Sequence, residues 1–521
     1  MVYSEIFHDR RERRDMAAGS IERQLAKLLQ SRAQLFALLF FLFALLNIST
    51  LANPPYWDEI LGLHNQAIYL ARSNFNLPQL YRAQEQFRNG GSCVYPFGIM
   101  PFVYGALYSL LPPVAVHIAG HLINLASLAA AGMLFLRLVR KFCSPGLTLL
   151  WGIAAFSEPI LSGRMAAQGQ EAALALGIML SLSLFFNRRE KAALAAAFAA
   201  CLIKTTGIVL LCAYAVWFLY AAAAGPVQER RKKLLAALAS GTGAVLFYSS
   251  AALLATQDYP EKSGVFHLGI ALLRYHLVHF YPWVALKLAA ALLLFAYLFF
   301  RRRLPSACRM AILPVFLGGF FTAYFIYTGP QLVRYSAIAM LPLALLLAYG
   351  FRACGEKRAA LAAAVLCALQ LMNQYGALLP ELPPHLAADP SQLERSREFL
   401  KVIEMNRAFA REVENAPVLP PLVCKWPYPQ ILTMPELRYV SRPLENVFSY
   451  GLHARYAPAP EADPATLSDG NTLYLYAADS MDSWFLPRFA PPPGVRVVYA
   501  ADLGGRPALL LFSGIRLLKT P

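Results

Sequence analysis

The sequence predicts an α-helical polytopic membrane protein with about 11 transmembrane helices, followed by a small C-terminal α/β domain outside the membrane. Three observations lead to this fold class. Hydrophobic residues make up 58% of the 521 residues and charged residues only 15%, whereas a soluble domain has about 25% charged residues. Long apolar stretches alternate with short basic runs. After residue 380 the composition changes to one rich in proline and charge.

The apolar stretches are the predicted membrane-spanning helices, since a helix needs about 20 apolar residues to cross a bilayer and broken helices cross with fewer. Stretches 192–205 and 207–222 are short and meet at Lys204, which predicts two half-length helices. The stretch 95–111 is also apolar, but a crossing there would put the next basic run outside, so we expect a helix lying on the outer leaflet. The predicted crossings are 33–51, 113–136, 146–163, 171–186, 192–205, 207–222, 234–255, 283–300, 310–328, 336–350 and 359–379.

Membrane topology explains the net charge of +17. A nucleic-acid-binding protein gathers its basic residues on one face, whereas these residues form short runs between apolar stretches, as the positive-inside rule describes for the cytoplasmic side. The chain is therefore predicted to be a multi-pass protein of the inner, or plasma, membrane, in contact with membrane lipids and with no nucleic-acid partner. Its N-terminus is expected in the cytoplasm and its C-terminal domain in the periplasm or outside the cell. The basic runs lie at 10–14, 137–141, 188–191, 230–233, 301–303 and 352–358.

Two domains are predicted. Residues 1–379 form the transmembrane domain, whose first outer loop spans 52–112, and residues 380–521 form the outer α/β domain. This tail has a helical pattern near 391–413 and a turn signal at Gly504-Gly505. Its strand-like runs are 471–477, 495–500 and 508–512.

The sharpest chemical feature is the pair Asp58-Glu59, which comes directly after the first predicted crossing. Two adjacent carboxylates at the membrane surface are unusual in a chain with only 30 acidic residues. A carboxylate in this position can act as a general base on an acceptor hydroxyl or amine. A solvated loop start, with Trp57 in the interfacial aromatic belt, explains these residues equally well.

Three further segments follow this pair along the chain. They are Tyr95-Pro96-Phe97-Gly98-Ile99-Met100-Pro101, Leu202-Ile203-Lys204-Thr205-Thr206-Gly207, and Arg334-Tyr335 followed by Pro342. Taken with Asp58-Glu59, they resemble in type and order the motifs of the GT-C glycosyltransferases, above all protein O-mannosyltransferases and lipid A aminoarabinose transferases. The resemblance covers the transmembrane part of the chain and implies a GT-C-like fold. It also implies the inverting transfer of a sugar from a polyprenyl-phosphate donor to a lipid, glycan or protein acceptor on the outer face.

The resemblance implies roles for the acidic residues. Asp58 corresponds to the catalytic base and Glu59 to the neighbour that orients the acceptor or tunes the pair. Glu171, at the start of the fourth crossing with Arg164 nearby, is the candidate for the second acidic group that the superfamily has in its next outer loop. No cofactor is implied with certainty, and a divalent cation near Asp58 and Glu171 is left open.

Two cations are candidates for holding the carrier phosphate. Lys204 lies in an otherwise apolar stretch, where an ionisable side chain is costly and therefore a functional candidate. Arg334 precedes a late helix, and its guanidinium can hold a phosphate through two hydrogen bonds. Both cations would stabilise the phosphate that leaves when the glycosyl bond breaks.

Further substrate-binding residues are expected in the outer loops. Arg274 and His276 lie in the loop 256–282, and Arg88 and Tyr95 lie in the first loop. All four have side chains able to bind phosphate or sugar hydroxyl groups.

Two other classes of function stay open beside the glycosyltransferase. A lipid or sugar transporter or flippase would have inverted repeats and charged residues near the membrane midplane. A non-catalytic assembly subunit would leave Asp58 and Glu59 merely exposed.

Overall fold

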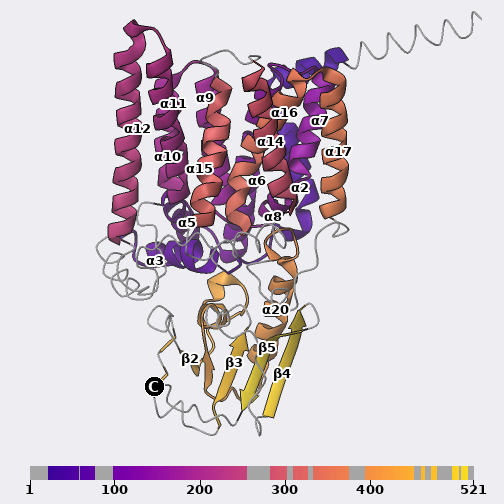
Figure 1. The fold of residues 1–521 in the computed structure, drawn as a ribbon. Coiled ribbons are helices and arrows are strands. Elements are labelled where there is room, and N and C mark those ends of the chain that lie inside the picture. The colour runs from indigo at the N-terminus through magenta and orange to yellow at the C-terminus, as the bar shows by residue number, and fades with distance from the viewer. Residues whose placement is uncertain are drawn as a thin grey trace, which may run out of the picture.

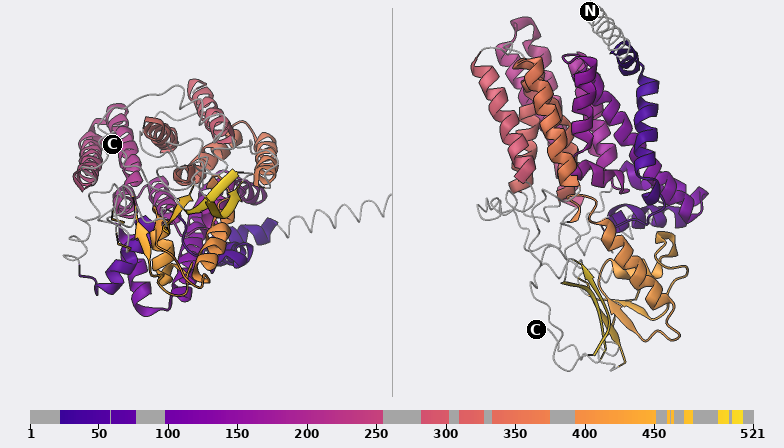
Figure 2. Two further views of the ribbon diagram at one scale, coloured as in Figure 1. Left: turned by 90° about the horizontal axis from the view of Figure 1, so that it is seen from below. Right: turned by 90° about the vertical axis from the view of Figure 1, so that its right-hand side faces the viewer.

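The computed structural model describes the chain in several ranges, to which the structural statements below apply. These ranges are 22–57, 59–76, 98–254, 282–301, 309–326, 333–374, 393–450, 459–460, 462–463, 471–477, 496–503 and 506–513. Long helices stand side by side in one layer, and a small sheet with short helices stands at one end of that layer (Figure 1; Figure 2, right). We call this the sheet end of the helical layer.

The upright helices coincide with the predicted apolar stretches. The stretch 171–186 is matched residue for residue by α9 (Glu171–Phe186). The other upright helices are α2 (Arg32–Leu46), α6 (Pro113–Val139), α7 (Pro145–Phe156), α10 (Glu190–Ile203), α11 (Ile208–Ala224), α12 (Val227–Leu254), α14 (Pro282–Phe300), α15 (Ile312–Ile326), α16 (Ala337–Ala353) and α17 (Glu356–Gln374). Hydropathy therefore located the helices well.

Length and composition single out three described helices that could cross a membrane: Pro113–Val139, Thr205–Ala224 and Arg334–Ala353. A fourth span results if the helix Glu22–Gln30 and α2, which are bent by 97°, count as one. Shorter apolar helices, α9 among them, stand beside these in the same layer (Figure 1). Several apolar helices thus suggest a multi-pass membrane protein, while the count of 11 crossings stays a prediction.

The structure corrects the predicted single crossing at 146–163. α7 ends at Phe156, and α8 (Pro159–Met165) begins after a break at Ser157 and Glu158. Pro159 has no backbone N–H and a fixed φ, so it favours the first turn of a helix and interrupts the middle of one. The break separates α8, whose residues are all buried, from the apolar helix before it.

The predicted junction at Lys204 is present, but the second helix is not half-length, because Thr205–Ala224 is long and apolar enough to cross a membrane. α10 ends at Ile203, Lys204 has an extended backbone with φ −156° and ψ 142°, and the turn η3 (Thr205–Gly207) leads into α11. A Cβ on residue 207 would lie 2.8 Å from the backbone carbon of Ala200, so only glycine fits this close approach. The junction brings the lysine to the shared end of two helices.

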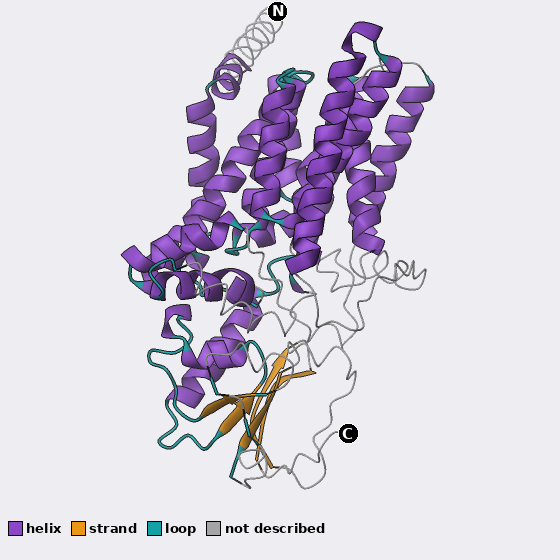
Figure 3. Ribbon diagram, turned by 90° about the vertical axis from the view of Figure 1, so that its left-hand side faces the viewer, coloured by secondary structure: helices purple, strands orange, loops and turns teal. Residues whose placement is uncertain are grey.

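Short helices lie across the sheet end of the helical layer (Figures 1 and 3). They are η2 (Ile60–Asn65), α3 (Gln66–Arg72) and α5 (Ile99–Leu110). α5 buries Met100 and Tyr104 and exposes Ile99 and Leu110. α5 therefore has an exposed apolar face, and its place on the outer leaflet stays a prediction.

The tail contains a five-stranded sheet of order β2-β1-β3-β5-β4. β1 pairs in parallel with β2 and β3, and the other pairs are antiparallel. The strands are β1 (Leu422–Cys424), β2 (Val447–Ser449), β3 (Leu473–Ala477), β4 (Arg496–Leu503) and β5 (Arg506–Ser513). The last three confirm the predicted strand runs, whereas β1 and β2 have three residues each and are too short to show an alternating pattern. The predicted turn at 504–505 lies outside the described residues.

The helix α20 (Leu400–Glu414) lies within the predicted helical region 391–413, apart from its last residue, and covers the sheet, with Phe409 and Tyr499 ring centroids 5.4 Å apart. The tail also holds the loop that follows α2. Tyr439 donates through its hydroxyl to the carbonyl of Pro55 (2.9 Å), and Arg438 donates to the carbonyl of Ala52 (2.8 Å). The predicted domain boundary at 379/380 lies outside the described residues and stays a prediction.

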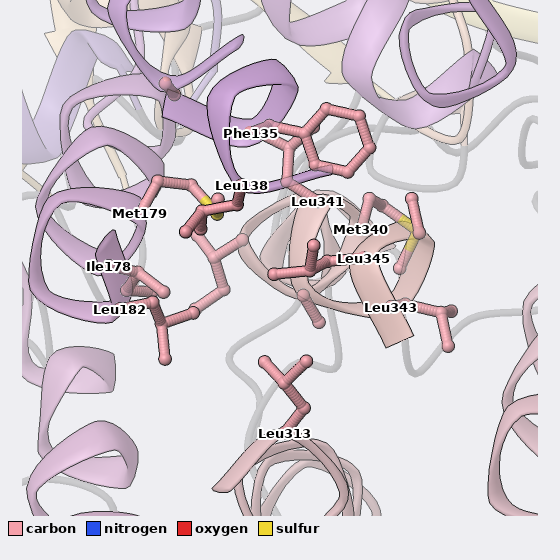
Figure 4. Close-up of a cluster of buried hydrophobic side chains, with 14 of the residues drawn as sticks. Phe135, Leu138, Ile178, Met179, Leu182, Leu313, Met340, Leu341, Leu343 and Leu345 are labelled. Carbon is pink, nitrogen blue, oxygen red and sulfur yellow. The ribbon is translucent and has the colours of Figure 1, made fainter. Parts of the chain in front are cut away.

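The apolar core of the helical layer lies among α6, α9, α15 and α16 (Figure 4). Phe135 from α6, Ile178 and Leu182 from α9, and Leu341 and Leu345 from α16 are almost fully buried there. Between membrane helices such side chains stabilise the contact through close van der Waals packing. This core holds the first residues of α9 and α16, and with them the site, in a fixed position.

Candidate functional site

A cluster of charged side chains, all of them buried except that of Lys204, lies where the sheet end of the helical layer meets the tail. We call it the charge cluster and define it by Glu59, Arg164, Glu171, Lys204, Arg334 and Glu394. Glu59 comes from the loop after α2, Arg164 from α8 and Glu171 from the start of α9. Lys204 comes from the α10–α11 junction, Arg334 from η7 (Val333–Ser336) and Glu394 from the tail. The structure therefore brings together five residues that the sequence predicted from separate segments.

Glu171 is the acidic centre of one half of the cluster. Lys204 Nζ donates to Glu171 Oε1 at 2.6 Å, and Arg334 Nε lies 3.7 Å from the same oxygen. Glu171 and Arg334 are buried, whereas the Lys204 side chain keeps 21% of its surface exposed. An anion that approaches from solvent would therefore meet Lys204 first.

Glu394 is the acidic centre of the other half, and no sequence pattern indicated it. Arg334 Nη1 donates to Glu394 Oε1 at 2.7 Å, and Arg164 Nη2 lies 3.5 Å from that oxygen. The Glu394 side chain is 0% exposed. The segment Ser391-Gln392-Leu393-Glu394-Arg395-Ser396-Arg397-Glu398 holds several charged residues, and periodicity does not distinguish the buried one.

Arg164 is buried with hydrogen-bonding capacity to spare. Its side chain is 2% exposed, and its guanidinium lies 5.4 Å from the centroid of the Phe399 ring. Among the described residues, its Nε and Nη1 have no hydrogen-bond partner. Buried guanidinium donors normally have partners, so these two N–H groups are suited to a ligand oxygen.

Glu59 is held by backbone amides on both carboxylate oxygens. Tyr56 N donates to Oε2 at 3.1 Å and Gln168 N donates to Oε1 at 3.0 Å. Burial raises the pKa of Glu59 from 4.5 to about 7, although Arg164 and Arg334 counteract the rise. A carboxyl group with a pKa near neutrality can exchange a proton near pH 7.

Gly169 allows two carboxylates of the cluster to approach each other. A Cβ on this residue would lie 2.3 Å from Glu171 Oε2 and 3.5 Å from Glu59 Oε1. No larger residue fits between these side chains without moving one of them. Glycine at this position thus couples the loop after α2 to the start of α9.

The backbone that leads into the acidic pair is strained. Trp57 has φ 40°, in the left-handed region that a bulky side chain rarely adopts. Its ring packs against Trp426 with centroids 5.4 Å apart and lies 5.6 Å from the guanidinium of Arg334. Such strain persists where the surroundings determine the conformation, and it is concentrated at functional sites.

Lys204 and Arg334 share the ring of Tyr335, the next residue of the motif that resembles the GT-C segment. Lys204 Nζ lies 4.3 Å and Arg334 Cζ 5.5 Å from the centroid of this ring. A cation–π contact holds a positive charge in place without neutralising it. The aromatic ring therefore fixes both cations while leaving them able to attract an anion.

A layer of buried histidines lies behind Glu59 and was missed by the sequence reasoning. His117 Nδ1 lies 3.5 Å from Gln168 Oε1, and its Nε2 lies 2.9 Å from the carbonyl of Glu436 in the tail. His64 Nδ1 lies 2.8 Å from the Tyr108 hydroxyl. The signal available in the sequence was His117 and His121 four residues apart on an otherwise apolar helix.

The other predicted site residues lie outside the described chain. They are Asp58, Arg88, Tyr95, Arg274 and His276. A divalent cation near Asp58 and Glu171 also stays a prediction, and the carboxylate of Glu171 is already paired with Lys204, so a metal ion would have to displace that ammonium group. Within the described ranges, no group of three or more His, Cys, Asp or Glu residues is placed to hold a metal ion.

Comparison with solved structures finds matches to ArnT, while no family model and no curated protein sequence matches the chain. A crystal structure of ArnT from Cupriavidus metallidurans in the apo state has 14% sequence identity and a TM-score of 0.45, and the match covers 94% of this chain and 100% of that one. The ArnT structure bound to undecaprenyl phosphate has 13% identity and a TM-score of 0.46, over 92% of this chain and 99% of that one.

Proposed function

We propose that the chain is a membrane glycosyltransferase that moves a sugar from a polyprenyl-phosphate donor to an acceptor. The reaction would take place at the sheet end of the helical layer. The observation that carries the proposal is the convergence of Arg164, Lys204 and Arg334 on one buried place beside Glu59. Cations gathered at one place suit a reaction in which a phosphate leaves, because they stabilise the charge that develops on it.

Charge balance supports phosphate as the ligand. The cluster holds three cations, two of which are paired with Glu171 and Glu394 through close contacts. When Glu59 is protonated, the six groups carry a net charge of +1, which favours an anion. Lys204, the most exposed of the cations, would meet the phosphate first, and the N–H groups of Arg164 provide additional donors.

The proposed step is a direct displacement with inversion at the anomeric carbon. A carboxylate base takes the proton of the acceptor hydroxyl or amine, and the lone pair freed on that atom forms the new bond to the anomeric carbon. The bond between the anomeric carbon and the phosphate oxygen breaks at the same time, and its electron pair stays on the polyprenyl phosphate. The cations stabilise the charge that develops on this leaving group.

Asp58 is the proposed base, and Glu59 is the residue that positions it. Two backbone amides and burial fix Glu59, so its carboxylate has little freedom to follow an acceptor. Asp58 lies outside the described residues, so its role rests on its place in the sequence directly before Glu59. This assignment follows the motif resemblance and stays open to the test below.

The test is a transfer assay on the purified full-length chain. Lipids that co-purify with the protein are first identified by mass spectrometry, and the polyprenyl-phosphate sugars among them are supplied as donors with a membrane lipid and glycan extract. We expect donor-dependent labelling of an acceptor that Asp58→Asn abolishes. Asp502→Asn, an exposed acid on β4, serves as the matched control and should keep full activity. Transfer that continues unchanged in Asp58→Asn would rule out this residue as the base.

The same material distinguishes the other classes of function. A transporter or flippase would move a labelled lipid across a vesicle membrane without breaking its glycosyl bond. A non-catalytic subunit would bind the lipid, leave its glycosyl bond intact and leave it on the same side of the membrane. Cleavage of the sugar–phosphate bond by the purified chain is the outcome that only the enzyme gives.

A further inference from the structure

A second group of charged residues lies at the opposite end of the helical layer from the sheet, where α11 turns into α12 (Figure 1). There a cavity of about 430 Å³ is lined by Arg188, Glu190, Glu229, Lys232, Lys233 and Arg309. We call it the basic pocket. It shares no residue with the charge cluster.

The basic pocket has an excess of positive charge. Its lining holds four cations and two carboxylates. Glu190 accepts from both Lys233 Nζ and Arg309 Nη2, each at 2.7 Å, so one carboxylate is shared by two cations. Within the described chain, Arg188 and Lys232 have no ion pair in this structure. The pocket therefore has a net charge of +2 and two cations available to an anion.

Aromatic rings and a carbonyl group position two of these cations. Arg309 lies with its guanidinium 5.0 Å from the centroid of the Phe185 ring and donates to the Phe185 carbonyl. Lys233 Nζ lies 5.6 Å from the centroids of the Trp217 and Phe218 rings. Because these side chains are fixed before any ligand arrives, an anion would lose less free energy in ordering them.

The backbone of the pocket is also specialised. Arg188 follows the end of α9 with φ 63°, a left-handed conformation that is uncommon for arginine. This turn directs the chain from α9 into Glu190, the first residue of α10. Arg188 and Glu190 are thus held close together by the tight turn between α9 and α10.

The helices beside the pocket have exposed apolar side chains. Val216 and Leu219 on α11, and Leu234, Leu235 and Leu238 on α12, are all exposed large hydrophobic residues. Exposed apolar side chains in this number on neighbouring helices are expected where a helix meets lipid rather than water. The pocket therefore lies on two helices that also expose large apolar side chains.

We propose that the basic pocket binds the phosphate group of an anionic phospholipid, whose acyl chains lie along the exposed apolar side chains of α11 and α12. Arg188 and Lys232 would hold the phosphate, and Glu190 would keep Lys233 and Arg309 in place. Pockets of basic residues between membrane helices bind anionic headgroups in this way. A free phosphate has the same charge chemistry but would not use the apolar surface, and this difference separates the two sources.

The experiment measures lipid binding to the full-length chain by native mass spectrometry, with phosphatidylglycerol against phosphatidylcholine at equal concentration. We expect a preference for phosphatidylglycerol that falls roughly tenfold or more in the double variant Arg188→Gln, Lys232→Gln, because removing a charge-assisted hydrogen bond weakens binding by about this factor. Neither residue has an ion pair among the described residues, so the variant should fold. Lys357→Gln with Arg358→Gln removes two charges at the start of α17, outside the pocket lining, as the matched control.

Three outcomes would overturn the proposal. The first is an equal loss of lipid binding in the control pair, which would mean that the lipid responds only to overall charge. The second is unchanged binding in the pocket variant. The third is displacement of the lipid by millimolar inorganic phosphate, which would make the ligand a free phosphate. The proposal requires that the control pair still binds phosphatidylglycerol and that the pocket variant does not. It also requires that inorganic phosphate does not displace the bound lipid.

Discussion

Glu394 is the residue of the charge cluster that only the structure reveals, and Glu394→Gln tests whether it neutralises two buried arginines. The substitution keeps the size of the side chain and one acceptor oxygen but removes the negative charge. Glu394 is fully buried, with Arg334 Nη1 at 2.7 Å and Arg164 Nη2 at 3.5 Å from one of its oxygens. Removing one partner from a buried ion pair typically costs about 3–5 kcal/mol. Since glutamine can still accept from Arg334, we expect a loss near the lower limit, about 3 kcal/mol.

The assay is reversible unfolding of the purified protein in mixed micelles, followed by tryptophan fluorescence. Glu414→Gln is the matched control, because Glu414 lies near the surface and accepts hydrogen bonds from Ser441, and loss of such a contact should cost about 1 kcal/mol or less. The double variant Glu394→Gln, Arg334→Gln should be less destabilised than the sum of the single variants. Equal stability of Glu394→Gln and the control, or strict additivity in the double variant, would refute the idea that Glu394 neutralises Arg334.

Three further results are expected. The free energy of unfolding should fall by up to about 3 kcal/mol as the pH rises from about 5 to about 8. The pKa of Glu59 is 4.5 in the unfolded chain and about 7 in the folded one, so the stabilisation present below the unfolded pKa is lost as the pH rises through the folded pKa. The same pH profile in Glu59→Gln as in the unchanged chain would contradict this. Lys204→Ala should weaken binding of polyprenyl phosphate in nanodiscs roughly tenfold to a hundredfold, and unchanged affinity would mean that Lys204 only pairs with Glu171. A membrane-impermeant maleimide should label Val418→Cys in intact cells and Val227→Cys only after permeabilisation. Both positions are exposed, and the predicted topology puts them on opposite sides of the membrane. The reverse labelling pattern would mean that the topology is inverted.

The sequence predicted that Glu171, Lys204 and Arg334 lie on the same side of the membrane, and their convergence on one place is a finding of the structure. Each lies at the end of an apolar stretch on the same predicted side of the membrane, so topology alone brings them to one plane. Hydropathy and alternation of basic runs determine that plane, whatever the packing of the helices. The ion pair between Lys204 and Glu171 then follows from the geometry of α9 and the α10–α11 junction.

Other parts of the site depend on tertiary contacts that no local pattern records. Glu394 enters the cluster because the tail packs on the loop after α2, and nothing in its neighbourhood distinguishes it from Glu398. The break before Pro159 was hidden by the uniform hydropathy of 146–163, although proline at the first turn of a helix was a usable signal. The strands β1 and β2 were too short for alternation to show.

The raised pKa of Glu59 could not be predicted from the sequence either. Two adjacent acids suggest mutual repulsion as the cause of any shift, whereas the structure makes burial the largest cause and the nearby arginines a counteracting one. Burial of this residue follows from Gln168 and Tyr56, which surround its carboxylate with backbone amides. Sequence reasoning therefore identified the residue and missed the physical reason for its properties.

The most direct test of the central claim compares Asp58→Asn with Glu59→Gln in a single-turnover sugar-transfer assay with saturating lipid-linked donor. Loss of a general base lowers the rate roughly 10²–10⁴-fold, so Asp58→Asn should reduce transfer by at least this range while donor binding persists. Glu59→Gln should reduce it less, because the amide oxygen of the new side chain can still accept from one of the two backbone amides that hold Glu59. The reverse order would assign the base to Glu59, and full activity in both variants would contradict the account of this chain as a carboxylate-dependent glycosyltransferase.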